Sequence, residues 1–167
     1  MGSDQVQIDV QSFRKRLGFL YSVWLGENST YDNEAIFKSL REVDLLYVLC
    51  GKGSSRDDGV IYKSMTVHYW LFGFEFSDTL ILITRGRRVF IITSPKKVAI
   101  LRQIYDEQFK SSDNLEIILI ERKGVLEDSL ECHKDTLMEI MKTTHKIGRI
   151  ESPGIQGGPF AILSLIH

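Results

Sequence analysis

The residues that could support chemistry are scattered along this 167-residue chain and form no recognisable catalytic set. The loop Gly51–Arg56 follows a strand-like run and suggests nucleotide binding, but arginine occupies the third glycine position of the dinucleotide fingerprint. The loop also lacks the Gly-Lys-Ser/Thr ending of a phosphate-binding P-loop. We therefore interpret it as a connecting loop and expect no nucleotide or other cofactor.

The carboxylates and histidines give no better site. Asp57 and Asp58 are adjacent on a glycine-flanked loop, where neighbouring side chains rarely converge on one reacting atom. The four histidines form no HExxH motif, and only Cys132-His133 brings a histidine beside a cysteine. Adjacent helical residues point about 100° apart, so a shared metal is not expected. No serine stands in a GxSxG motif. The sequence predicts no enzyme and no metal site.

The run Ser94-Pro95-Lys96-Lys97 is the first candidate for partner binding. Ser94 suits the N-cap of a helix and Pro95 its first position. Lys96 and Lys97 then fall in the first turn, where the helix dipole disfavours positive charge by about 0.3–1 kcal/mol each. Free backbone N–H groups and two ammonium groups would accept a partner's carboxylate. The alternative, which the local pattern favours, is a capped helix with two solvated lysines.

Arg87 and Arg88, with Arg85, form a second basic candidate at a predicted hairpin turn. They could bind an acidic partner. The alternative is an exposed arginine-rich turn that prevents edge-to-edge aggregation.

Hydrophobic periodicity predicts alternating helices and strands. Alternation with one hairpin predicts an α/β fold, a mixed sheet flanked by helices, in one domain over residues 9–167, with residues 1–8 disordered or derived from expression. The expected helices are Val10 to near Gly26, Asn33–Arg41, an aromatic helix including Met65–Phe76, Pro95–Phe109 and Ser129–Thr143; the expected strands are Val43–Cys50, Thr79–Thr84, Arg87–Ser94, Leu115–Arg122 and Lys146–Ile150; Glu27–Asn33 and Gly51–Gly59 are expected loops.

The aromatic helix has apolar residues on nearly every side, which is typical of a buried helix. We expect its aromatic side chains to be core and not a ligand site: Tyr69, Trp70, Phe72 and Phe74.

Composition narrows the function. The chain is 43% hydrophobic and 26% charged, with a net charge of −1, so it lacks the basic footprint of a strong duplex-DNA binder. No apolar run reaches the roughly 18 residues of a membrane span, so no membrane role is expected. Two lone cysteines suit a reducing compartment; we expect no disulfide between Cys50 and Cys132, and a buried Cys50 thiol.

Several of these segments together resemble a known family. The residues that carry the resemblance are Tyr62-Lys63-Ser64, Trp70-Leu71-Phe72-Gly73-Phe74-Glu75, Asp78-Thr79, Ser94-Pro95-Lys96-Lys97 and, near the start, Phe13, Arg14, Arg16, Leu20-Tyr21-Ser22 and Trp24. From about Asp9 to Phe160 the chain is similar to the N-terminal domain of the large subunit of the FACT histone chaperone. That domain has the fold of the N-terminal lobe of aminopeptidase P and creatinase, without peptidase activity.

The resemblance implies a non-catalytic protein-interaction domain. Its expected partners are core histones, chiefly the tetramer-forming pair, and, through other domains, the small subunit of the FACT heterodimer. The resemblance also implies a nuclear, chromosome-associated protein that disassembles and reassembles nucleosomes in transcription, replication and repair. It favours Ser94 and Lys97 as partner-binding residues. The alternative is the N-terminal lobe of an active Xaa-Pro aminopeptidase or prolidase-type metallopeptidase, whose metal-bearing pita-bread lobe is not in this chain.

Overall fold

A computed structural model describes residues 6–31, 38, 40–50, 63–105, 114–122, 138, 147–150 and 164–165 of the chain. The predicted Gly51–Gly59 loop lies outside these residues, as does the predicted Ser129–Thr143 helix apart from the helical Met138. The helices are α1 (Val10–Trp24), η1 (Ser29–Tyr31), α3 (Lys63–Phe72), α4 (Pro95–Leu101) and η3 (Arg102–Tyr105); the strands are β1 (Leu45–Cys50), β2 (Thr79–Thr84), β3 (Arg88–Thr93), β4 (Glu116–Glu121), β5 (Ile147–Ile150) and β6 (Ser164–Leu165).

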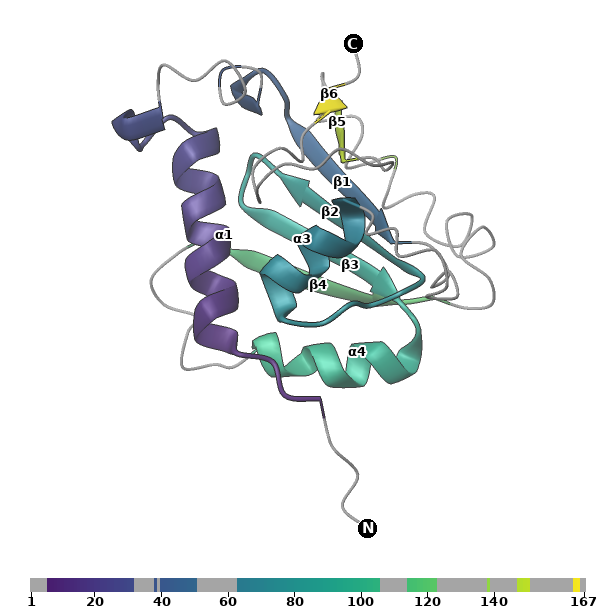
Figure 1. Ribbon diagram of the computed structural model, residues 1–167. Coiled ribbons are helices and arrows are strands. Elements are labelled where there is room, and N and C mark those ends of the chain that lie inside the picture. The colour runs from purple at the N-terminus through teal and green to yellow at the C-terminus, as the bar shows by residue number, and fades with distance from the viewer. Residues whose placement is uncertain are drawn as a thin grey trace.

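The six strands form one mixed sheet in the order β4-β3-β2-β1-β5-β6 (Figure 1). β2 is antiparallel to both β1 and β3, whereas β4 runs parallel to β3 and β5 parallel to β1. β6 is antiparallel to β5. The predicted α/β architecture is therefore confirmed, and the carboxyl ends of β1, β3 and β4 lie at the same edge of the sheet.

Helix α1 forms as its sequence predicts. The Asp9 carboxylate caps it by accepting from the Ser12 backbone N–H at 3.0 Å, which satisfies a donor that the first turn leaves free. The helix ends at Trp24, and Gly26 follows its C-cap Leu25 with a φ of 75° that suits glycine. Its buried stripe includes Tyr21 and Trp24, which also tie the helix to the sheet. Tyr21 Oη donates to the Thr84 carbonyl at 3.1 Å, and Trp24 Nε1 donates to the Val43 carbonyl at 2.8 Å.

The main core lies between one face of the sheet and the helices α1, α3, α4 and η3, which Figure 1 shows on the same side of the strands. A second buried cluster occupies the opposite face and consists of Leu45, Leu80, Leu82, Phe90 and Ile92. No helix in the described part of the chain is long and apolar enough to cross a bilayer.

Three element predictions need correction. The aromatic helix ends at Phe72 and not near Phe76, because Gly73 turns the chain with a φ of 77°. Helix α4 ends at Leu101, and η3 carries the chain on to Tyr105 as a tighter 3₁₀ turn. The predicted Glu27–Asn33 loop contains the short 3₁₀ helix η1. The predicted Asn33–Arg41 helix is seen at Lys38, Leu40 and Arg41, and its other residues lie outside the described ones.

The first described residues, Val6 to Ile8, contact the 3₁₀ helix η3. The Gln103 side-chain amide accepts from the Ile8 backbone N–H at 3.0 Å and donates to the Val6 carbonyl at 2.9 Å. Ile8 is buried in the main core. Gln103 therefore fastens the first described segment to η3.

Candidate functional site

The five predicted binding residues lie at opposite ends of β3. Arg87 and Arg88 stand where the strand begins, and Ser94, Lys96 and Lys97 follow its end. A six-residue strand spans about 20 Å. The structure therefore divides these residues into two separate basic positions and does not bring them together.

The hairpin arginines both have partners within the molecule. Arg87 has a φ of 61°, and its Nη2 lies 3.1 Å and 3.3 Å from the two Glu27 carboxylate oxygens. Its guanidinium also lies 5.4 Å from the centre of the Tyr21 ring. Arg88 Nε donates to the Glu116 carboxylate at 2.9 Å. Exposed ion pairs of this kind contribute at most about 1 kcal/mol, so an incoming carboxylate could replace either glutamate at small cost.

At the other end of β3, Ser94 occupies the N-cap of α4 as predicted, but its side chain makes no capping hydrogen bond. The Ser94 carbonyl instead accepts from the backbone N–H groups of Lys97 at 3.0 Å and Val98 at 2.9 Å. Ser94 is therefore the N-cap by position, and the helix starts on its proline and backbone geometry.

The two lysines after Pro95 have different surroundings. Lys96 is exposed, whereas Lys97 is partly buried and its Nζ donates to both the carbonyl and the hydroxyl oxygen of Ser77. Burial lowers the pKa of Lys97, and the nearby Asp78 carboxylate acts in the opposite direction. Lys97 therefore fastens the loop before β2 onto α4, and Lys96 is the lysine that a partner can reach.

Lys97 belongs to a polar cluster that the sequence reasoning did not find. This strand-end cluster lies where β1, β3 and β4 end and β2 begins, and its members are Cys50, His68, Glu75, Ser77, Asp78, Thr79, Thr93, Lys97 and Arg122. Glu75, Asp78, Thr79 and Lys97 are among the residues that carried the family resemblance. Polar residues directly before or after apolar strand runs were the available signal, because such residues meet at a sheet edge.

Specific contacts hold the cluster together. The buried hydroxyls of Thr79 and Thr93 lie 2.7 Å apart across β2 and β3. Arg122 Nη2 lies 3.5 Å from the Asp78 carboxylate, in a pair whose two side chains are 14% and 22% exposed. The cations Lys97 and Arg122 and the carboxylates Glu75 and Asp78 therefore balance one another at this partly buried edge.

His68 is fully buried at the inner side of the cluster. Its Nδ1 accepts from the Phe76 backbone N–H at 3.2 Å, so the neutral ring carries its proton on Nε2. Burial, together with the smaller effect of the positive charge of Lys97, lowers the pKa of His68 to about 4. The imidazole is therefore neutral at physiological pH and helps to hold the loop after α3.

Cys50 does not act as a nucleophile here. Its sulfur lies 3.8 Å from a Glu75 carboxylate oxygen, and burial together with that charge raises the thiol pKa to about 11. The thiol thus stays protonated, whereas a reactive cysteine is a thiolate. The prediction of a free, buried Cys50 is confirmed, while Cys132 lies outside the described residues. Among the described residues no group of three metal-binding side chains occurs.

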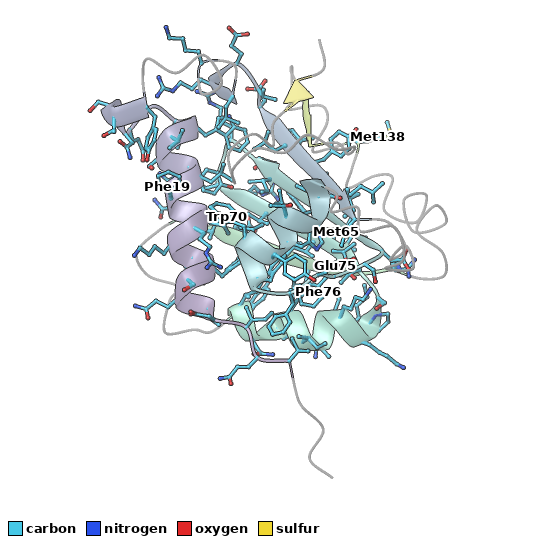
Figure 2. All side chains as sticks on the ribbon, in the orientation of Figure 1. Phe19, Met65, Trp70, Glu75, Phe76 and Met138 are labelled. Carbon is cyan, nitrogen blue, oxygen red and sulfur yellow. The ribbon has the colours of Figure 1, made fainter. Side chains whose placement is uncertain are left out.

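Two aromatic residues next to members of the strand-end cluster in the sequence are exposed. Gly73 to Asp78 form the loop that leads from α3 to β2; Figure 2 shows Glu75 and Phe76 in it, close to α4. Tyr69 is 46% exposed and Phe74 38% exposed. The prediction that all four aromatics are core is wrong for these two; Phe72 is buried and Trp70 partly buried against the core.

The fold is that of a known protein lobe. It matches the N-terminal domain of FACT complex subunit SPT16 from Cicer arietinum (chickpea) with a TM-score of 0.67 at 24% identity, over 93% of this chain and 33% of that one. The corresponding domain from Eremothecium gossypii matches with a TM-score of 0.67 at 21% identity, over 93% of this chain and 32% of that one. The chain therefore has the architecture of an α/β N-terminal lobe.

Sequence comparison then defines the family. The model described as "FACT complex subunit SPT16 N-terminal lobe domain" matches residues 8–160, and the chain belongs to this family. The FACT complex subunit SPT16 of Candida glabrata is 32% identical over 93% of this chain and 14% of its own length. That of Mycosarcoma maydis is 36% identical over 58% of this chain and 8% of its own length. The chain thus spans a small part of the relatives that it matches.

Family membership decides between the two functional hypotheses. The predicted resemblance to the FACT large subunit is confirmed. The family is a non-catalytic one, so the prediction that this domain is no enzyme is confirmed and the peptidase alternative is set aside.

Proposed function

We propose that this domain is a histone-binding module of a FACT-type histone chaperone large subunit. The observation that carries the proposal is the family match over residues 8–160. In the whole protein the domain would act in the nucleus, on chromatin, while nucleosomes are disassembled and reassembled in transcription, replication and repair. Its partners would be core histones, chiefly the tetramer-forming pair, and other domains would bind the small subunit of the complex.

The surface supports binding by shape and local contacts more than by bulk charge. With a net charge of −1 the domain has no strong field to attract basic histones, so specific contacts must supply the affinity. Exposed aromatic residues suit this role, because aromatic side chains are enriched at interface hot spots. Tyr69 on α3 and Phe74 in the loop after α3 are two such exposed aromatic residues in the described part of the chain.

We assign the predicted basic residues different parts in this binding. Lys96 and Arg88 are exposed and can contact a partner directly. Arg87 is 28% exposed and would contribute from its pair with Glu27. Ser94 and Lys97 would act indirectly, by fixing the start of α4 and the loop before β2.

A titration against the tetramer-forming histones near physiological salt tests the proposal. We expect saturable binding that weakens several-fold in Phe74→Ala and in Lys96→Ala. The matched control is Lys15→Ala, which removes a different exposed lysine, on α1. Each variant is first shown to be folded by circular dichroism. If neither change weakens binding, the domain still binds histones but does not use this surface. Absence of binding at tens of micromolar would refute histone binding by this domain.

A further inference from the structure

Strand β4 is at the edge of the sheet. Within the described residues it pairs only with β3, and Figure 1 shows it as the outermost strand on that side. An edge strand presents a row of backbone N–H and C=O groups that can pair with another chain, and proteins usually cover or charge such an edge. The sequence of β4 is EIILIE, which places four apolar residues between two glutamates.

The hydrogen bonds of β4 show which backbone groups face outward. The Glu116 N–H donates to the Arg87 carbonyl, and the Arg122 N–H donates to the Thr93 carbonyl. Along a parallel strand, alternate residues direct both backbone groups toward the same neighbour. Residues 116, 118, 120 and 122 therefore face β3, and residues 117, 119 and 121 face away from it.

One outward group already has a partner. The Tyr105 hydroxyl donates to the Ile117 carbonyl, which closes the first part of the edge. No contact among the described residues occupies the outward N–H and C=O of Leu119. The open position among the described residues is therefore Leu119 in the middle of β4, whose backbone groups can pair with an added strand.

A depression lies beside the closed half of the edge. It has a volume of about 200 Å³ and is lined largely by apolar side chains, with Ile104, Tyr105, Leu115 and Ile117 among them. A side chain of an added strand could enter it, and such pockets give strand addition its specificity.

Charge and size indicate the kind of occupant. Glu116 and Glu121, 60% and 51% exposed, stand at the two ends of β4 and can attract basic residues of a partner. Their present partners Arg88 and Arg102 form exposed pairs that contribute at most about 1 kcal/mol. A six-residue edge of about 20 Å is too short for the roughly 1,200–2,000 Å² of a stable dimer, which argues against a second copy of the chain.

We propose that β4 binds an extended peptide segment by strand addition, with apolar side chains at alternate positions and basic residues at its ends. The outward backbone groups of Leu119 form the central hydrogen bonds, and the depression beside Tyr105 receives one apolar side chain. This site differs from the histone contacts proposed at Phe74 and Lys96, although Arg88, another of the proposed contacts, pairs with Glu116 at one end of β4. It does not require a histone as partner.

The test uses the whole chain and a labelled synthetic peptide, Lys-Thr-Val-Thr-Val-Thr-Val-Lys. We expect binding in the micromolar range by fluorescence anisotropy. A second peptide carries N-methyl groups on alternate backbone nitrogens, so it keeps the side chains but cannot pair as a strand; we expect it to bind at least tenfold more weakly. Equal binding of the two peptides, or no binding at 1 mM, overturns the proposal.

Amide hydrogen exchange on the unmodified protein gives a second measurement. Saturation with the first peptide should slow exchange at Leu119 at least tenfold, while Ile118 and Ile120, already bonded to β3, should change little. Exchange at Leu119 that is unaffected by bound peptide overturns the proposal. Leu119→Pro removes an outward N–H and leaves the β3 ladder intact, so a folded Leu119→Pro protein should lose peptide binding; a folded variant that still binds also overturns it.

Peptide competition separates this inference from the proposed function. The histone titration is repeated with the peptide at saturation. Undiminished histone binding means that the two surfaces are distinct, as proposed. Loss of histone binding contradicts the proposed separation and would place the histone on the β4 edge. Sedimentation of the chain alone checks self-association: a concentration-dependent dimer that Leu119→Pro abolishes would show that a second copy is the occupant and overturn the peptide proposal.

Discussion

Lys97 offers the sharpest test of how the strand-end cluster works. Lys97→Met keeps the side-chain stem and removes the ammonium group that donates to the carbonyl and hydroxyl of Ser77. A hydrogen bond to a charged group contributes about 1.5–3 kcal/mol where it is buried. Lys97 is only partly buried, so water can replace part of the lost donation, and its lowered pKa shows that burying the charge already costs some stability. We expect Lys97→Met to lower the free energy of unfolding by about 1–2 kcal/mol.

Lys96→Met is the matched control, because it makes the same chemical change one residue away on an exposed side chain. Such surface changes usually stay within about 0.5 kcal/mol. Urea unfolding followed by the fluorescence of Trp24 and Trp70 measures both variants. With a urea slope of about 2 kcal/mol per molar, the midpoint for Lys97→Met should fall by about 0.5–1 M. If both variants unfold at the same midpoint, Lys97 does not hold the loop, and the assignment of a structural role to it is wrong.

Three further predictions concern the interior of the same cluster. The pKa of His68 falls from its ordinary 6.5 to about 4 in the folded state, so its contribution to stability is complete above pH 6.5 and is lost as the pH falls toward 4 and below. Wild type should therefore lose more unfolding free energy than His68→Gln between pH 7 and pH 4, by up to about 3 kcal/mol; parallel losses in urea titrations would contradict this. In a Cys132→Ser background, Cys50 should resist a thiol reagent at pH 8 until urea unfolds the chain, and rapid labelling of the native protein would show that the thiol is accessible. A double-mutant cycle of Thr79→Val and Thr93→Val should give a coupling of about 1 kcal/mol, because Thr79→Val leaves the buried Thr93 hydroxyl without its partner, whereas after Thr93→Val the Thr79 hydroxyl still donates to the Ser77 carbonyl; strictly additive losses would contradict a direct hydrogen bond.

The sequence predicted those parts of the fold that depend on local periodicity. α1 and the β2–β3 hairpin appear close to their expected bounds, since apolar spacing alone distinguishes a helix of period 3.6 from a strand of period 2. The end of the aromatic helix was missed because apolar residues continue past Gly73, and only the φ of that glycine shows that the helix has stopped. The exposure of Phe74 follows from the same turn.

The candidate site was harder to predict than the fold. Residue type does not distinguish Lys96 from Lys97. They differ because Ser77, twenty positions earlier in the chain, accepts a hydrogen bond from Lys97. Likewise, the internal partners of Arg87 and Arg88 come from Glu27 and Glu116, which no local pattern connects to the hairpin. Pairings between distant segments depend on the completed sheet, so a single sequence reveals the charges but not which of them remain available.

The position of β1 in the middle of the sheet has a consequence for synthesis of the protein. One of its neighbours, β2, leaves the ribosome soon after it, but the other, β5, is made about a hundred residues later. Because synthesis adds about 5–20 residues per second, the side of β1 that later pairs with β5 stays unpaired for roughly 5–20 s. During that interval the apolar run Leu45–Cys50 is an open template for other nascent chains. Chaperone binding or a translation pause should therefore matter most between the emergence of β2 and that of β5.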